Sequence, residues 1–192
     1  MDDRVIFSPS TMDEYIDWKL FHNRTIFIDE DIFDNTAQKV CGLIELMVDE
    51  SSSEPITLLI TSPGGSVYAA MAIHDTIMRA REQHGISVIA EARGYAASAA
   101  AVIMQAADVR LATRHTRLLI HEVSVFKMFE QAKASSAKEE AEEMGKVNDM
   151  LSTILAERSG HTLEEVNTLI SKTDVWLSAE EAVAWGLIDA IV

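Results

Sequence analysis

Residues 56–67 read ITLLITSPGGSV, and this stretch combines an apolar strand, a glycine turn and the start of a helix. The run 56–60 is apolar at nearly every position, which predicts a strand buried on both faces. Pro63 followed by Gly64 favours a tight turn. The apolar spacing over 67–77 then predicts a helix. A strand and a helix joined in this way indicate an α/β fold with largely parallel strands.

The same alternation continues on both sides of this stretch. We expect further strands at 25–28, 87–90, 109–112 and 116–120, and helices at 34–47 and 98–106, with Gly94 breaking the chain after the third strand. A long helix is expected over about 136–158, ended by Gly160. Three capping boxes, each a Ser or Thr three residues before Glu, predict helix starts at Ser136, Thr162 and Ser178.

Composition restricts the class of protein. The chain has 192 residues, which suits one domain, expected over 14–192 after a mobile tail at 1–13. The formal net charge of −15 argues against binding to nucleic acid or to an anionic membrane surface. We expect no signal peptide and no membrane span, because residues 1–4 are acidic overall and no apolar run reaches the roughly 20 residues that span a bilayer. Cys41 is the only cysteine, so no disulfide forms within the chain, and we expect a cytoplasmic protein.

The stretch 94–101, GYAASAAA, is a candidate nucleophile turn. Ser98 follows a predicted strand and opens a predicted helix, where a turn exposes a hydroxyl and free N–H groups can stabilise an oxyanion. Small neighbours on both sides would let a substrate carbonyl approach closely. The alternative interpretation is an ordinary serine that caps an alanine-rich helix.

Two further features could belong to the same site. Gly64 and Gly65 leave the backbone bare, so an extended peptide could come within hydrogen-bonding distance; the alternative is a simple turn with Ser66 capping the next helix. His121 ends an apolar strand and could act as a general base, although a histidine in this position can also be structural.

A serine–histidine pair usually has a carboxylate that orients the imidazole. Glu122 is adjacent to His121, so its side chain would point to the opposite face of a strand. Asp174, which precedes the run 175–177, is therefore the better candidate, although spacing alone cannot bring it to His121. The sequence has no metal-ligand pattern, and we expect neither a metal nor another cofactor.

At these motifs the chain resembles the ClpP family of serine peptidases. The similar segments are 60–67 (ITSPGGSV), 94–98 (GYAAS), 119–121 (LIH), 174–182 (DVWLSAEEA) and 185–189 (WGLID). They recur in the family's order, and the resemblance covers 14–192. Glu122 and Val123 depart from the glutamine and proline that the family usually has after the histidine.

The resemblance implies a ClpP/crotonase-like spiral of ββα units with a protruding handle helix at about 136–158. It implies Ser98 as nucleophile, His121 as base and Asp174 as the orienting acid. It also implies an oxyanion hole formed by the N–H groups of Gly65 and Ala99. Substrate would bind along Gly64, Gly65, Glu122 and Val123.

The resemblance further implies an assembly of two stacked seven-membered rings, a tetradecamer that encloses the active sites. Unfolded polypeptides would be the substrates, and an AAA+ unfoldase ATPase would be a partner. The first alternative is a weakly active or silent structural subunit of a mixed ring. Others are a ClpP-like peptidase of the phage or accessory type with a different partner, a related serine peptidase that degrades signal peptides or matures phage heads, and a crotonase-fold enzyme acting on acyl-CoA.

Overall fold

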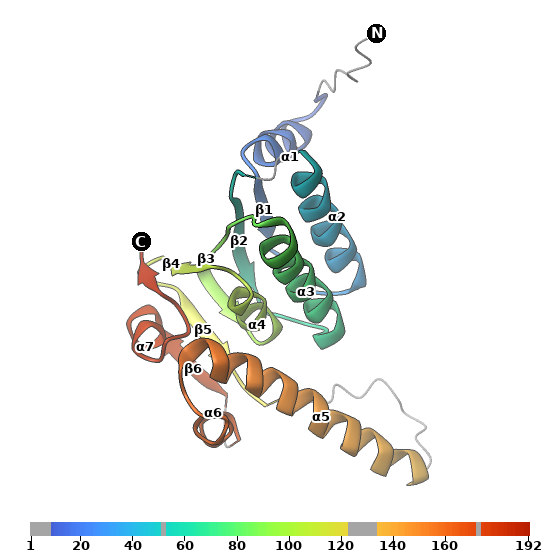
Figure 1. Ribbon diagram of the computed structural model, residues 1–192, viewed down its shortest axis with the longest axis vertical. Helices are drawn as coiled ribbons and strands as arrows, with labels where there is room; N and C mark the ends of the chain where they lie inside the picture. Colours follow the sequence, from blue (N-terminus) through green and yellow to red (C-terminus); the bar gives the residue numbers. More distant parts are fainter. Residues whose placement is uncertain (1–8, 51–52, 123–133, 172–173) are drawn as a thin grey trace.

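The computed structural model describes residues 9–50, 53–122, 134–171 and 174–192 (Figure 1). In this part of the chain the elements are, in order, α1 (Met12–His22), β1 (Thr25–Ile28), α2 (Asp34–Glu50), β2 (Ile56–Ser62), α3 (Val67–His84), β3 (Val88–Ala97), α4 (Ala99–Gln105), β4 (Val109–Ala112), β5 (Arg117–Ile120), α5 (Ala134–Ser159), α6 (Leu163–Ile170), β6 (Val175–Ser178), α7 (Ala179–Ala184) and β7 (Ala190–Ile191). The predicted α/β alternation is confirmed.

The strands form one mixed sheet. Its main path is β1-β2-β3-β4-β7, with every neighbouring pair parallel. β5 also pairs in parallel with β3, and β6 pairs antiparallel with β5. In Figure 1, α2 and α3 lie side by side against the sheet, α4 lies near the centre of the molecule, and α5 extends away from the body. This arrangement agrees with the prediction of a largely parallel sheet and with the protruding helix.

The core explains why these strands form. β2 is buried at Ile56, Leu58 and Ile60, and all seven residues of α4 are buried. Burying an isoleucine or leucine side chain contributes about 1.5–3 kcal/mol, so the apolar run of β2 stabilises the sheet from its centre.

Gly94 does not end the third strand, and this prediction was wrong. β3 continues through Gly94 to Ala97, and Gly94 has a φ of 72°, a left-handed conformation that glycine adopts without steric cost. Before this residue β3 pairs with β4, and after it β3 pairs with β5. The register with β2 also shifts here. Gly94 therefore acts as a bulge at which β3 changes partner.

Two of the three predicted capping boxes are confirmed. Thr162 and Ser178 each accept a hydrogen bond from the glutamate N–H three residues later, and each glutamate side chain bonds back. The box at Ser136 was wrong, because α5 begins at Ala134 and Ser136 therefore lies within the helix.

The N-terminal helix α1 was not predicted. It begins at Met12 with Thr11 as its cap, so the last two positions of the expected tail belong to a helix. Residues 1–8 of that tail lie outside the described residues. α1 has no buried residue and a mixed apolar and polar sequence, so it has no clear periodic signal.

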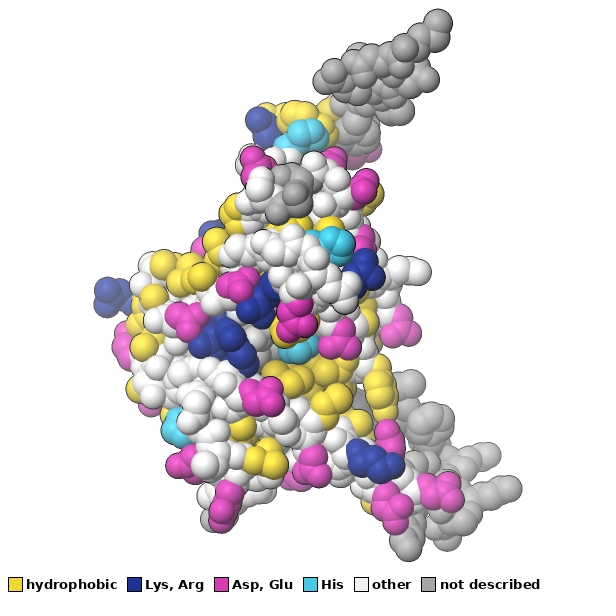
Figure 2. All heavy atoms as spheres, viewed as in Figure 1, with side chains coloured by type: hydrophobic (Ala, Val, Ile, Leu, Met, Phe, Trp, Pro, Cys, Tyr) yellow, Lys and Arg dark blue, Asp and Glu magenta, His cyan; other side chains and the backbone are white. Residues whose placement is uncertain are grey.

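The charged side chains on the surface reflect the acidic composition of the chain. In Figure 2 acidic side chains are spread over the visible face, with smaller groups of Lys and Arg between them. None of the helices in the described part of the chain is both long and apolar enough to cross a membrane.

A partly buried group of charges, here called the arginine cluster, connects several elements. It consists of Arg81, Arg110, Arg158, Asp108 and Asp189. Arg81 pairs with Asp108 at 2.7 Å, and Arg110 pairs with Asp189 at 2.5 Å. Burial alone would raise the pKa of each aspartate, but hydrogen bonds and positive charge from the arginines bring both pKa values below their ordinary range.

These depressed pKa values predict a loss of stability in acid. Stability from a carboxyl whose pKa is lower in the folded state is present above the unfolded pKa, about 3.9, and is lost as pH falls through the folded value. We therefore expect the urea midpoint to fall as pH drops below about 4. Asp189→Asn should lower the midpoint at neutral pH and flatten this acid dependence, and Asp75→Asn, at an exposed position, should do neither. An unchanged acid slope in Asp189→Asn would contradict the assignment.

Candidate active site

Three strand ends meet at one edge of the sheet. Ser98 follows the last residue of β3, His121 follows the last residue of β5, and Asp174 precedes the first residue of β6. Parallel pairing of β3 with β5 brings Ser98 beside His121, and the Ser98 N–H donates to the Leu119 carbonyl at 2.8 Å. Antiparallel pairing opposes Ile120 to Val175, so His121 and Asp174 are the next opposed positions. Side chains at opposed positions lie on the same face.

The Ser98 hydroxyl contacts an imidazole. Its Oγ lies 2.8 Å from His121 Nε2, within hydrogen-bonding distance. Ser98 has φ 55° and ψ −123°, an unusual backbone conformation for a residue other than glycine. Its side chain does not cap α4. The interpretation of Ser98 as an ordinary capping serine is therefore wrong, because the strained turn directs the hydroxyl towards His121.

Asp174 lies near the other imidazole nitrogen but does not touch it. Its Oδ1 is 3.9 Å from His121 Nδ1, longer than a hydrogen bond. The Asp174 side chain is 68% exposed, whereas that of His121 is 20% exposed. Water therefore screens the attraction, and a small movement would be needed for a direct hydrogen bond.

Gly64 packs directly against the Ser98 turn. A Cβ atom at Gly64 would lie 2.8 Å from Ser98 Cβ, 2.6 Å from the Ala97 carbonyl oxygen and 2.9 Å from Ala99 N. Gly64 also has a φ of 91°. No other residue fits this position without displacing the nucleophile turn.

Gly65 is held in a bridge that leaves its own N–H unused. The Ile32 N–H donates to Gly64 O at 2.8 Å, and the Ser66 N–H donates to Ile32 O at 2.7 Å. The Ala99 N–H lies at the start of α4, where it has no partner within the helix. Within the described residues, neither the Gly65 nor the Ala99 N–H has an acceptor. Both N–H groups are therefore available to a further acceptor.

Two supporting contacts were not anticipated from the sequence. The Ser62 hydroxyl donates to Glu30 O at 2.6 Å and accepts from the Gly64 N–H at 3.1 Å, which fixes the glycine turn. Ile32 holds Gly65 through its backbone alone. A serine before Pro-Gly is a weak signal for such a turn, but nothing in the sequence marks Ile32.

The remaining predicted residues are less informative. Ser66 caps α3 by accepting from the Ala69 N–H, as the turn interpretation expected. Glu122 is exposed beside His121. Val123 lies outside the described residues. The described chain contains no group of three or more His, Cys, Asp or Glu side chains that could hold a metal ion.

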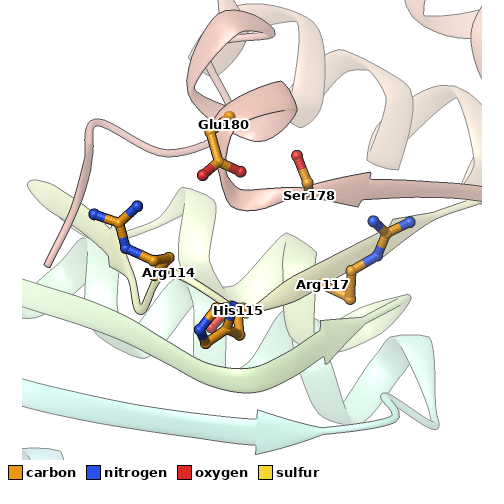
Figure 3. Close-up of a pocket in the computed structure, with 6 residues that line it drawn as sticks. Arg114, His115, Arg117, Ser178 and Glu180 are labelled. Carbon is orange, nitrogen blue, oxygen red and sulfur yellow. The ribbon is translucent and has the colours of Figure 1, made fainter.

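An open cavity of about 420 Å³ lies away from these residues. Figure 3 shows Arg114, His115 and Arg117 on one side of it and Ser178 and Glu180 on the other. Arg117 is opposed to Ser178 at the far end of the β5–β6 pair. This cavity is therefore separate from the site at the strand ends.

A hydroxyl within hydrogen-bonding distance of an imidazole, at a turn that starts a helix, is an arrangement typical of serine hydrolases. The chain belongs to the Clp protease family, whose sequence profile matches residues 10–192. This membership supports the Clp protease fold for the α/β architecture described above, and it identifies the chain as a serine-type peptidase.

Curated relatives agree along nearly the full chain. The "ATP-dependent Clp protease proteolytic subunit 3" of Synechococcus sp. (strain CC9902) is 35% identical, covering 95% of this chain and 90% of the relative. The "ATP-dependent Clp protease proteolytic subunit 2" of Prochlorococcus marinus (strain NATL2A) is 34% identical, covering 91% and 84%. The "ATP-dependent Clp protease proteolytic subunit 1" of Tropheryma whipplei (strain Twist) is 33% identical, covering 100% and 90%. These relatives favour an endopeptidase over a silent structural subunit.

Proposed function

We propose that Ser98 is the nucleophile of this serine endopeptidase, with His121 as general base and Asp174 as the group that orients the imidazole. The 2.8 Å contact between Ser98 Oγ and His121 Nε2 is the observation that carries the proposal. This geometry suits direct transfer of the serine proton as the hydroxyl attacks a peptide carbonyl.

The reaction would proceed in two stages. Ser98 Oγ attacks the carbonyl carbon while its proton moves to His121 Nε2, and the oxyanion accepts hydrogen bonds from the Gly65 and Ala99 N–H groups. The intermediate then collapses, and His121 returns the proton to the leaving amine, which leaves an acyl-enzyme on Ser98. Water, deprotonated by His121, attacks the ester, and His121 returns the proton to Ser98 Oγ as the ester C–O bond breaks and the carboxylic acid leaves.

An extended peptide would bind along the glycine turn. Gly64 and Gly65 have no side chain to prevent a second backbone from approaching, and their turn lies against the nucleophile. We also assign substrate binding to Glu122, which is exposed and follows His121 in the sequence.

Labelling with a fluorophosphonate probe tests the nucleophile. We expect the purified protein to react covalently with the probe, and Ser98→Ala to lose this reaction completely. Ser87→Ala, which removes an exposed serine before β3, should label like the wild type. Wild-type protein that never labels, in any oligomeric state, would favour a structural subunit instead.

Asp174→Asn should reduce activity less than substitution of Ser98 or His121. Because the carboxylate is exposed and 3.9 Å from the imidazole, we expect kcat/KM for a fluorogenic peptide to fall about 10- to 100-fold. Asp75→Asn, at another exposed aspartate, is the control. Full activity in Asp174→Asn would remove this residue from the site.

The family forms ring-shaped oligomers that associate with Clp ATPases. For this chain we propose two stacked seven-membered rings in the cytoplasm, with an AAA+ unfoldase that feeds unfolded polypeptides to the sites. α5 is the proposed contact between rings. Met150 on this helix is 40% exposed, and Leu151 and Ile154 are partly exposed beside it.

The mass in solution tests the assembly. We expect a species far heavier than the 21.2 kDa chain at micromolar concentration, and Met150→Glu should divide it into lighter rings by placing a charge in the apolar contact. Thr153→Glu, which adds the same charge at an exposed position on α5, should keep the wild-type mass. A wild-type monomer at this concentration would contradict the proposed assembly.

A further inference from the structure

The short helix that begins at the nucleophile turn, α4, is buried along its whole length. The carbonyl groups at its C-terminal end therefore need donors from the protein. Arg81 Nη1 donates at 2.6 Å to the carbonyl of Ala106, the C-cap of α4, and Arg158 Nη2 donates at 2.7 Å to the carbonyl of Ala107, the next residue. Arg110 Nη1 donates to the side chain of Gln105 at 2.8 Å. Three arginines from three separate elements therefore hold this end of α4.

Arg158 connects this end to the long helix. It lies in the last turn of α5, and besides donating to Ala107 it accepts a hydrogen bond on its own carbonyl from Arg110 Nη1 at 3.2 Å. Arg110 also donates to Gly186 O at 2.8 Å, which includes the C-terminal segment in the same group. A shift of α5 would therefore pull on the C-terminal end of α4.

The cost of this arrangement suggests a role beyond simple packing. The Nε atoms of Arg81 and Arg158 are buried, and among the described residues they have no acceptor. A buried donor without a partner costs about 1–3 kcal/mol. Among the described residues, these three guanidinium groups face two carboxylates, Asp108 and Asp189, so positive charge remains beside the carbonyls at the C-terminal end of α4, where it is favourable.

The opposite end of α4 carries the reacting groups. Seven residues of helix extend about 10 Å, so a tilt at the C-terminal end is transmitted directly to Ser98 and to the Ala99 N–H. His121 follows β5 and is not part of α4. Displacements of about 1 Å between reacting groups can cost about 100-fold in rate.

We propose that Arg158 is a positioning residue that links α5 to the nucleophile by fixing the axis of α4. This inference rests on the proposed role of Ser98. It identifies a route by which a contact made on the long helix sets the alignment of the serine with His121, about one helix length away.

Arg158→Met, Arg158→Lys and the control Arg79→Met test the proposal. Arg79 lies on the surface of α3 and pairs with Glu45 there, so its loss removes an arginine without touching α4. For each variant we would measure the rate of fluorophosphonate labelling, kcat and KM for a short peptide, the mass in solution and the urea midpoint. The full-length assembled protein is used throughout.

We expect Arg158→Met to label about 10- to 100-fold more slowly, with a matching loss in kcat and a KM within about twofold of wild type. Arg158→Lys keeps a donor near Ala107 and should recover part of the rate. Arg79→Met should match the wild type in every measurement.

Labelling of folded, fully assembled Arg158→Met at the wild-type rate would overturn the inference. If Arg158→Met does not fold, Arg158→Lys decides, and a wild-type rate in that variant would likewise overturn it. Wild-type protein that fails to label would instead reject the role of Ser98, so the two failures are distinguishable.

Discussion

His121→Ala is expected to lower kcat/KM for a fluorogenic peptide by a factor on the order of 10⁵. The change removes the group that lies 2.8 Å from Ser98 Oγ, so the serine hydroxyl loses its proton acceptor and the leaving amine loses its proton donor. Loss of the base in such a site costs about as much as loss of the nucleophile, because the two act as one unit. Ser98→Ala and the double variant should therefore be as inactive as His121→Ala.

His115→Ala provides the matched control. His115 is an exposed histidine on the turn before β5, away from the strand ends. It should retain wild-type kcat/KM and wild-type labelling. Activity in His121→Ala above about a tenth of wild type would show that another group takes the serine proton.

Gly64→Ala should have the second largest effect. The added methyl group would lie within 3.0 Å of the Ala97 carbonyl, the Ser98 side chain and Ala99 N, and two of these three atoms are backbone. These clashes can be removed only if the turn that carries the nucleophile and one oxyanion donor moves. Loss of one such donor costs about 100- to 1000-fold in kcat, and we expect kcat to fall by at least this factor.

The stability of Gly64→Ala and a control substitution at a second glycine separate backbone strain from the effect on the reacting groups. The left-handed φ of Gly64 adds about 1–2 kcal/mol of strain when alanine replaces it, so the urea midpoint should also fall. Gly42→Ala, on α2, meets no atom within 4 Å and should be as active as wild type and slightly more stable. Wild-type kcat in Gly64→Ala would mean that this turn does not touch the reacting groups.

Local patterns predicted much of the fold. The glycine turn between β2 and α3 was predicted because apolar period, Pro and Gly all favour the same structure there. The capping boxes at Thr162 and Ser178 were predicted for the same reason, since each depends on residues three apart. Ser98 was a candidate because its neighbours on both sides are small and lie between a strand and a helix.

Features that depend on long-range pairing of strands could not be predicted from the sequence. The sequence placed Asp174 before an apolar run, but only the antiparallel register of β6 on β5 opposes it to His121. Gly94 was expected to end a strand, because a bulge and a break have the same local signal. The bridge from Ile32 to Gly65 uses only backbone atoms, so no side-chain pattern could indicate it.

The change of partner at Gly94 leaves β5 paired with the central sheet over a short stretch. In the described part of the chain, β5 pairs with β3 at Tyr95, Ala96 and Ala97, and β6 pairs with β5 alone. The imidazole and the carboxylate are thus carried on a two-stranded flap, whereas the hydroxyl belongs to the central sheet. Amide hydrogens of β5 and β6 should then exchange before those of β2.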